Sequence, residues 1–163
     1  MVASALLPHI IARWARLYAD SKVVSTSFTY LHLAGVLVGG GFAIAADRGA
    51  LRLPPERGPE RSSDLASLTT VHRWVIAGLA LTFVTGLFML LADLDTFLPS
   101  VVFWTKMGLI ALLLVNGYVK LRDEAALLNG VDSAWRRLRR TTVWSLVLWF
   151  AVLLAGTILT AAA

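Results

Sequence analysis

Polar side chains inside apolar stretches are the first residues of this sequence that could do chemistry. His32 and Lys106 lie about seven and six residues, roughly 10 and 9 Å, from one end of their stretches. Thr85 and Thr157 fall at a similar depth in two further stretches. A polar group in hydrocarbon is costly unless it faces the interior of a bundle, a partner or a cavity. We therefore expect these four side chains to line one polar site.

An imidazole, an ammonium and two hydroxyls at membrane depth could bind copper, haem b or the headgroup of a quinone. A structural interpretation stands beside this one. In it, Lys106 extends to the lipid headgroups or pairs with Asp93 or Asp95. His32 then only hydrogen-bonds a hydroxyl across helices.

The sequence contains three histidines that could bind a metal, and it contains no cysteine. His32 is the candidate ligand within the membrane, and His9 is its candidate partner. His72, beside Arg73 and Trp74 near the opposite face, is interpreted as interfacial. Because His32 and His72 are about 14 Å apart along the membrane normal, they cannot flank one haem iron. A haem would need His9, a ligand other than histidine, or a second copy of the chain.

The composition of the chain indicates which elements must position these residues. The 163 residues are 58% hydrophobic and 15% charged, and the mean hydropathy is +0.73, so the chain needs lipid as its solvent. Backbone groups in hydrocarbon must be bonded within the segment, which favours helices. The sequence predicts an all-α fold, with a four-helix transmembrane domain over 25–163. Apolar stretches of spanning length cover 25–46, 68–92, 100–119 and 142–163.

Basic residues are concentrated in two of the three connections between these stretches. They are Arg48, Arg52, Arg57 and Arg61 in the first connection, and Lys120, Arg122, Arg136, Arg137, Arg139 and Arg140 in the third. The middle connection carries Asp93 and Asp95 and no basic residue. The positive-inside rule then predicts a multi-pass protein of the bacterial inner membrane, with arginine-rich loops in the cytoplasm and both termini in the periplasm. The polar site would face outward.

The segment 1–24 has the pattern of an amphipathic helix. One face carries Leu6, Leu7, Ile10, Ile11, Trp14, Leu17 and Tyr18, and the other His9, Arg13, Arg16 and Asp20. We expect it to lie in the outer membrane interface or to pack against a partner subunit. Within the first stretch, Gly35 and Gly39 share one face, which favours close approach of a neighbouring helix. Gly78, Gly86 and Gly156 are interpreted in the same way.

Several classes of function are excluded or disfavoured by the sequence. The net charge of +5 arises largely from arginines between the apolar stretches, so we expect no nucleic-acid partner. No acidic residue lies inside a predicted span, which argues against proton transport or proteolysis through an intramembrane carboxylate. Walker, zinc-protease and nucleophile-elbow motifs are also missing. We expect no enzymatic activity on this basis.

Short motifs in the first three stretches resemble those of small bacterial four-helix membrane proteins related to the copper-resistance D (CopD) type. The motifs are Tyr30-Leu31-His32-Leu33-Ala34-Gly35, Gly39-Gly40-Gly41, Asp47-Arg48, Leu51-Arg52, Thr85-Gly86-Leu87 and Phe103-x-x-Lys106. The resemblance implies an inner-membrane protein in which the outward histidine and lysine matter, with copper handling as the family's label.

Three functional classes remain open. One is an inner-membrane protein with copper, haem b or a quinone at the outward site. Another is an accessory subunit of a larger respiratory or photosynthetic type of complex, in which other membrane subunits or further copies of the chain cover its apolar faces. A solute carrier comes third, because four spans are few and no broken helix is evident.

Overall fold

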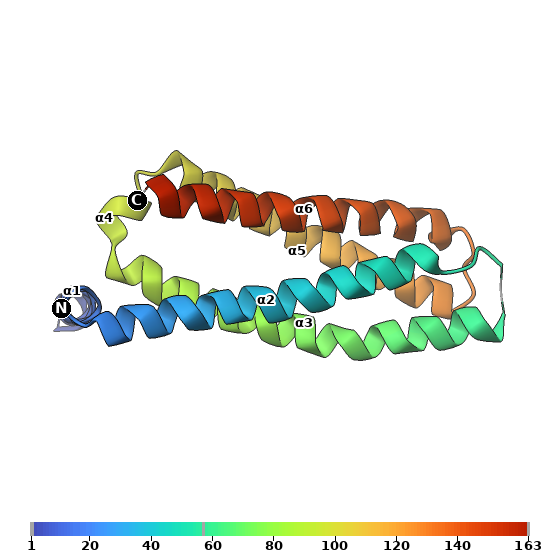
Figure 1. Cartoon of the computed structure of the whole chain (residues 1–163), viewed down its shortest axis with the longest axis horizontal. Helices are drawn as coiled ribbons and strands as arrows, with labels where there is room; N and C mark the ends of the chain where they lie inside the picture. The colour runs from blue at the N-terminus through green and yellow to red at the C-terminus, as the bar shows by residue number, and fades with distance from the viewer. Residues whose placement is uncertain (1, 57, 163) are drawn as a thin grey trace.

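Long helices account for nearly all of the protein in the computed structural model, which describes residues 2–56 and 58–162 (Figure 1). The elements are α1 (Val2–Asp20), α2 (Lys22–Arg52), α3 (Pro59–Ala92), α4 (Leu94–Phe97), α5 (Val101–Leu128) and α6 (Ala134–Ala162). Four of them, α2, α3, α5 and α6, are long and apolar enough to cross a membrane. The predicted all-α, four-span fold with an N-terminal helix is confirmed. Met1, Arg57, Ala163 and the side chains of Leu6 and Leu7, which the predictions also covered, lie outside the described part.

Helix starts follow from local capping chemistry. The Ser21 hydroxyl accepts a hydrogen bond from the Val24 backbone N–H (3.4 Å), and this ends α1 and begins α2 after a single residue. Ser100 does the same for α5 through the Phe103 N–H (3.3 Å). Such caps satisfy N–H groups that the first helical turn leaves without a partner.

The helices run further than the apolar stretches. The apolar stretches leave connections at 47–67 and 120–141, whereas the helices leave only 53–58 and 129–133 between them. The expected helical continuation of residues 134–140 into the fourth span is confirmed. Charged residues there continue the helical spacing instead of ending it, and several are buried. The tight connection between α5 and α6 needs Gly130, whose φ of 84° lies in the left-handed region that favours glycine. We call the end of the bundle that holds these two connections the Arg-rich end, and the opposite end the α4 end.

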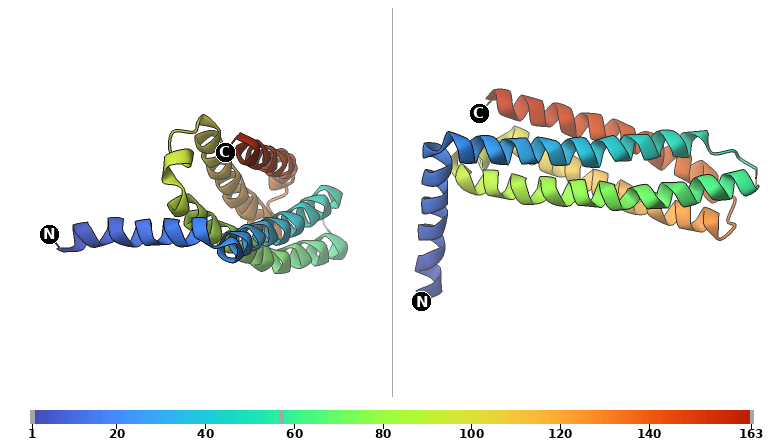
Figure 2. Two further views of the ribbon diagram at one scale, coloured as in Figure 1. Left: turned by 60° about the vertical axis from the view of Figure 1, so that its left-hand side comes forward. Right: turned by 60° about the horizontal axis from the view of Figure 1, so that its bottom comes forward.

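The four long helices form two hairpins, α2 with α3 and α5 with α6 (Figures 1 and 2). Between the hairpins the main contact is that of α2 with α6, while α3 and α5 touch little. The short helix α4 joins the two hairpins at the α4 end. Because α3 and α5 touch little, the few side chains that lie between these two helices decide how closely the hairpins approach each other.

Crosswise to the bundle, α1 runs out sideways at the α4 end (Figure 2). Its indole Trp14 Nε1 donates a hydrogen bond to the Phe88 carbonyl of α3 (2.8 Å). The Trp14 ring also packs on Phe28 and Phe88, with centroids 5.0 and 5.3 Å away. These contacts attach the C-terminal half of α1 to the bundle, while His9 and Ile10 are exposed.

Glycines bring α2 and α3 into backbone contact, as the spacing of Gly35 and Gly39 predicts. A Cβ built on Gly35 would lie 2.8 Å from the Thr82 nitrogen, and one on Gly78 would overlap the Gly39 backbone. No hydrophobic effect drives helices together in lipid, so such close packing is a main source of their association.

The apolar core lies at the Arg-rich end, away from the middle of the spans. Small and aliphatic side chains from all four long helices, and one from the first connection, bury one another there. They are Ala46, Ala50, Leu53, Leu65, Leu68, Leu127, Ala134 and Leu138. This core holds the hairpins together at the end where the charged connections begin.

Gly78→Ala should destabilise the bundle by about 1–3 kcal/mol, because the added methyl group meets backbone that cannot move aside. Gly41→Ala is the matched control: nothing lies within 4 Å of a Cβ at that position, so the better helix propensity of alanine should leave stability equal or higher. Unfolding of both variants in detergent measures the difference. Equal stabilities would show that the glycine contact is not needed.

Candidate functional site

One hydrogen bond links two of the four residues that the sequence placed in the outward polar site. His32 Nδ1 of α2 lies 3.2 Å from the Thr85 hydroxyl of α3. That hydroxyl is 2.7 Å from the Leu81 carbonyl of its own helix, to which it donates its single proton. Thr85 must then accept from His32 Nδ1–H, so Nε2 of a neutral imidazole carries the lone pair. The ring packs so closely on Gly86 that a Cβ there would lie 3.0 Å from its Cε1 atom.

Lys106 belongs to the α5–α6 hairpin. We call His32, Thr85 and Lys106 the His32 layer. The Lys106 Nζ would lie 3.5 Å from a Cβ at Gly156, so the side chain runs over α6 at a glycine. Within the described part of the chain Lys106 forms no hydrogen bond or ion pair, and it pairs with neither Asp93 nor Asp95.

The other two predicted residues lie apart from this layer. The Thr157 side chain is exposed, and its hydroxyl donates to the Leu153 carbonyl of its own helix (3.0 Å). His9 is exposed on α1, five residues before Trp14, where the helix meets the bundle. Over residues 2–56 and 58–162, no group of three histidine, aspartate or glutamate side chains could hold a metal ion.

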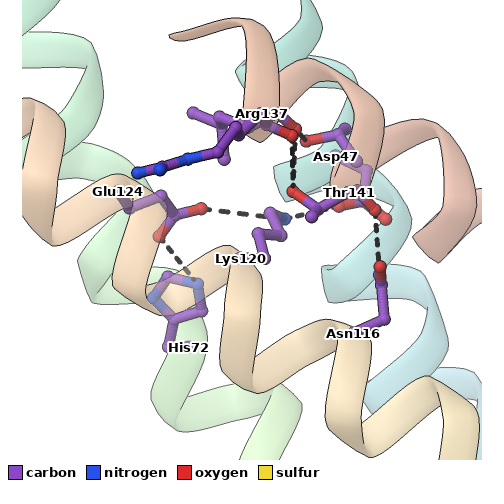
Figure 3. A network of polar contacts seen from close by, with 9 residues as sticks. Asp47, His72, Asn116, Lys120, Glu124, Arg137 and Thr141 are labelled. Carbon is purple, nitrogen blue, oxygen red and sulfur yellow. Dashed lines mark hydrogen bonds and ion pairs between the residues drawn. The ribbon is translucent and has the colours of Figure 1, made fainter. Parts of the chain in front are cut away.

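A second polar cluster, which sequence reasoning missed, lies inside the Arg-rich end (Figure 3). At its centre the Lys120 ammonium of α5 contacts the Asp47 carboxylate of α2. Glu124 Oε1 is 3.8 Å from Lys120 Nζ, and Glu124 Oε2 is 3.3 Å from Nε2 of His72 on α3. We call Asp47, His72, Lys120 and Glu124 the charged cluster. It joins three helices.

Three of the four residues of the charged cluster are almost completely buried, and the His72 side chain is 19% exposed. The residue exposures are 0% for Asp47, 6% for Lys120 and 2% for Glu124. Asp47 Oδ2 and both Glu124 oxygens have no hydrogen-bond partner among the described residues. The distances to Glu124 are therefore ion-pair contacts without well-formed hydrogen bonds, and this carboxylate is the least satisfied group of the cluster.

The α5–α6 hairpin supports the cluster with two polar contacts of its own (Figure 3). Asn116 Nδ2 donates to the Thr141 carbonyl (2.8 Å), and Arg137 Nε donates to the buried Asp123 carboxylate (3.0 Å). Both contacts hold α6 against the face of α5 that carries Lys120. The cluster therefore rests on a fixed helix pair.

His72 was interpreted as interfacial, and its contact with Glu124 inside the Arg-rich end was not predicted. The missed signal is helical spacing: Leu113, Lys120, Glu124 and Leu127 are all buried on one face of α5. His72 is also thirteen residues from Thr85, about 20 Å along α3. His32 and His72 therefore cannot share an iron within one chain.

Comparison with known proteins assigns no family. The chain matches no family model, no curated protein and no solved structure. The similarity of its short motifs to the copper-resistance D type therefore remains a prediction.

Lys120→Met should cost about 3–5 kcal/mol, because it leaves two buried carboxylates without their cation. Arg122→Met, two residues away on the exposed side of α5, should change stability by no more than about 0.5 kcal/mol. Chemical unfolding in detergent gives both values. If the two variants were equally stable, the charged cluster would not contribute to the stability of the fold.

Proposed function

We propose that this chain is a multi-pass protein of the bacterial inner membrane that binds the headgroup of a redox-active quinone between His32 and Lys106, near the outer face. One observation carries the proposal: Lys106 has no counter-ion among the described residues, although it is half-buried in a membrane-length helix. An inward cation in such a position is costly and is typical of a functional site. An electron-rich ligand oxygen would compensate it.

The chemistry of a quinone fits the groups that face this position. A quinone carbonyl accepts a hydrogen bond from the Lys106 ammonium. The reduced form carries an O–H group that donates to the lone pair on His32 Nε2, the nitrogen that the Thr85 bond leaves as an acceptor. A polar group at each end of the ring is the small set of contacts that orients a mostly apolar ligand.

Copper and haem b require more ligands than this layer supplies. A structural or transport metal site uses several protein ligands, and no group of three histidines and carboxylates in the described residues is placed so that it could hold a metal ion. A b-type haem would need a second ligand for His32. His9 or a second copy of the chain would have to provide it. Binding of copper or of haem b is therefore an alternative result of the ligand experiment.

The orientation in the proposal rests on charge. The Arg-rich end carries Arg48, Arg52, Arg61, Arg122, Arg136, Arg137, Arg139 and Arg140, whereas the connection at the α4 end carries Asp93 and Asp95. By the positive-inside rule the Arg-rich end is cytoplasmic. The termini and the His32 layer are then on the periplasmic side, with α1 along the outer membrane surface.

An accessory subunit of a larger membrane complex is the second candidate, and α1 favours it. This helix extends beyond the bundle (Figure 2), and its side chains Ile10 and Leu17 are 61% and 51% exposed. Lipid or another subunit would cover them. In this case the His32 layer has no ligand.

The absence of cysteine from the sequence makes the orientation directly testable with single-cysteine variants. Glu56→Cys and Asn129→Cys should react with a membrane-impermeant maleimide only after the inner membrane is opened. Asp95→Cys should react in intact spheroplasts. Labelling of Asp95→Cys only from the cytoplasmic side would reverse the topology and move the His32 layer to the inner face.

Titration of the purified protein with a short-chain ubiquinone, followed by tryptophan fluorescence quenching, tests the ligand. Lys106→Met and His32→Ala should each weaken binding by roughly tenfold, the loss expected for one hydrogen bond to a charged or buried group. The control is Thr105→Val, a neighbour of Lys106 whose exposed hydroxyl bonds only to its own helix.

The other outcomes of the experiment each select a different function. A Soret band in the absorption spectrum of the purified protein would select haem, and stoichiometric copper that His32→Ala removes would select copper binding. If none of the three ligands binds, the accessory-subunit function takes the place of the proposal.

A further inference from the structure

The charged cluster is one positive charge short of neutrality. Asp47 and Glu124 bring two negative charges and Lys120 one positive charge, so a neutral His72 leaves a net charge of −1. The nearby pair of Asp123 and Arg137 is neutral by itself. An uncompensated charge is strongly disfavoured where the carboxylates are 0% and 2% exposed.

We infer that the charged cluster is a proton-binding site, and that the missing positive charge is one exchangeable proton held between His72 Nε2 and Glu124 Oε2. These atoms are 3.3 Å apart. The proton either makes an imidazolium beside a carboxylate or makes a carboxylic acid beside a neutral imidazole. Both arrangements bring the cluster to zero charge, and in both a hydrogen bond can join His72 Nε2 to Glu124 Oε2.

Groups from every packed helix define the surroundings of this proton. They are Asp47 of α2, His72 of α3, Lys120, Asp123 and Glu124 of α5, and Arg137 of α6. Lys120 is shared between two carboxylates, and Arg137 is occupied by Asp123. Neither cation can therefore neutralise Glu124 fully, and among the described residues a proton is the remaining source of positive charge.

The proton also has a mechanical effect, because the contact between His72 and Glu124 ties α3 to α5. Apart from the apolar core, to which Leu65 and Leu68 of α3 and Leu127 of α5 belong, these two helices touch little. With the proton bound, the tie is an ion pair or a strong hydrogen bond. Without it, Glu124 is a buried anion that is better solvated if α3 moves away from α5. Proton loss at this site therefore loosens the junction of the two hairpins.

The sign of the pH effect follows from linkage. The folded cluster binds the proton more tightly than the same side chains do in the unfolded chain, where water solvates each charge. The extra stability is then present at low pH and is lost as the pH rises through the range in which histidine releases its proton, about pH 5 to 8. Removing Glu124's charge should abolish this loss.

Thermal melting of the full-length protein in detergent tests the inference. The background is His9→Gln with His32→Gln, which leaves His72 as the sole histidine. Its Tm should fall by about 5 °C between pH 5.5 and pH 8. Glu124→Gln in this background should melt near the parent at pH 5.5 and above it at pH 8, since its cluster is neutral without a proton.

An ordinary structural ion pair gives a different pattern, in which Glu124→Gln melts below the parent at both pH values. That pattern, or a parent Tm that does not change with pH, would overturn the inference. If the background does not fold, the wild-type protein labelled with ¹⁵N-histidine replaces it. One imidazole should then titrate together with a carboxyl signal, and its titration should vanish in Glu124→Gln.

Discussion

Lipid provides almost no hydrophobic driving force between helices, and the arrangement of this bundle follows from that constraint. Within the apolar part of α2 and α3, association comes from glycines that let the backbones touch. At the Arg-rich end, where the chain approaches water, aliphatic side chains can again be driven together. The apolar core and the charged cluster both lie at that end. The bundle is therefore joined most firmly at one end.

The two polar layers solve the problem of buried charge in opposite ways. At the Arg-rich end, Lys120 meets two carboxylates, and a proton completes the balance. At the α4 end, Lys106 has no partner among the described residues, while His32 and Thr85 are bonded to each other. The first layer is complete within the protein, apart from its proton. In the second layer the charge of Lys106 is not compensated by a described residue, and for this reason we assign the proposed binding function to it.

Sequence reasoning predicted the parts of the fold that depend on composition and period. Apolar length revealed the four spans, and the spacing of Gly35 and Gly39 revealed the tight face of α2. It predicted the extension of α6 over residues 134–140 but missed how far the helices continue around Asp47 and Lys120, because a hydropathy profile assigns these charged residues to loops. A charge is tolerated inside a helix bundle only when its partner comes from another helix, and such pairing is not encoded locally. The contact of His72 with Glu124 was missed for the same reason.

The same limit applies to the site. The contact between His32 and Thr85 followed from their estimated depths, since both helices are continuous from their caps. The depth of Thr157 was equally well estimated, yet its hydroxyl turns to its own helix and to the exposed side. Depth follows from counting residues, whereas the direction of a side chain depends on how each hairpin is rotated in the bundle.

The short connections at 53–58 and 129–133 also bear on how the protein is made. Each hairpin is a local unit: its two helices are consecutive in the chain and already pack along each other. The first hairpin can leave the ribosome and enter the membrane as a pair while the second is still being translated. Contacts between the hairpins, with Lys120 reaching Asp47 across 73 residues, close last. We therefore expect biogenesis in two insertions and one docking step, with the charged residues as the last to leave water.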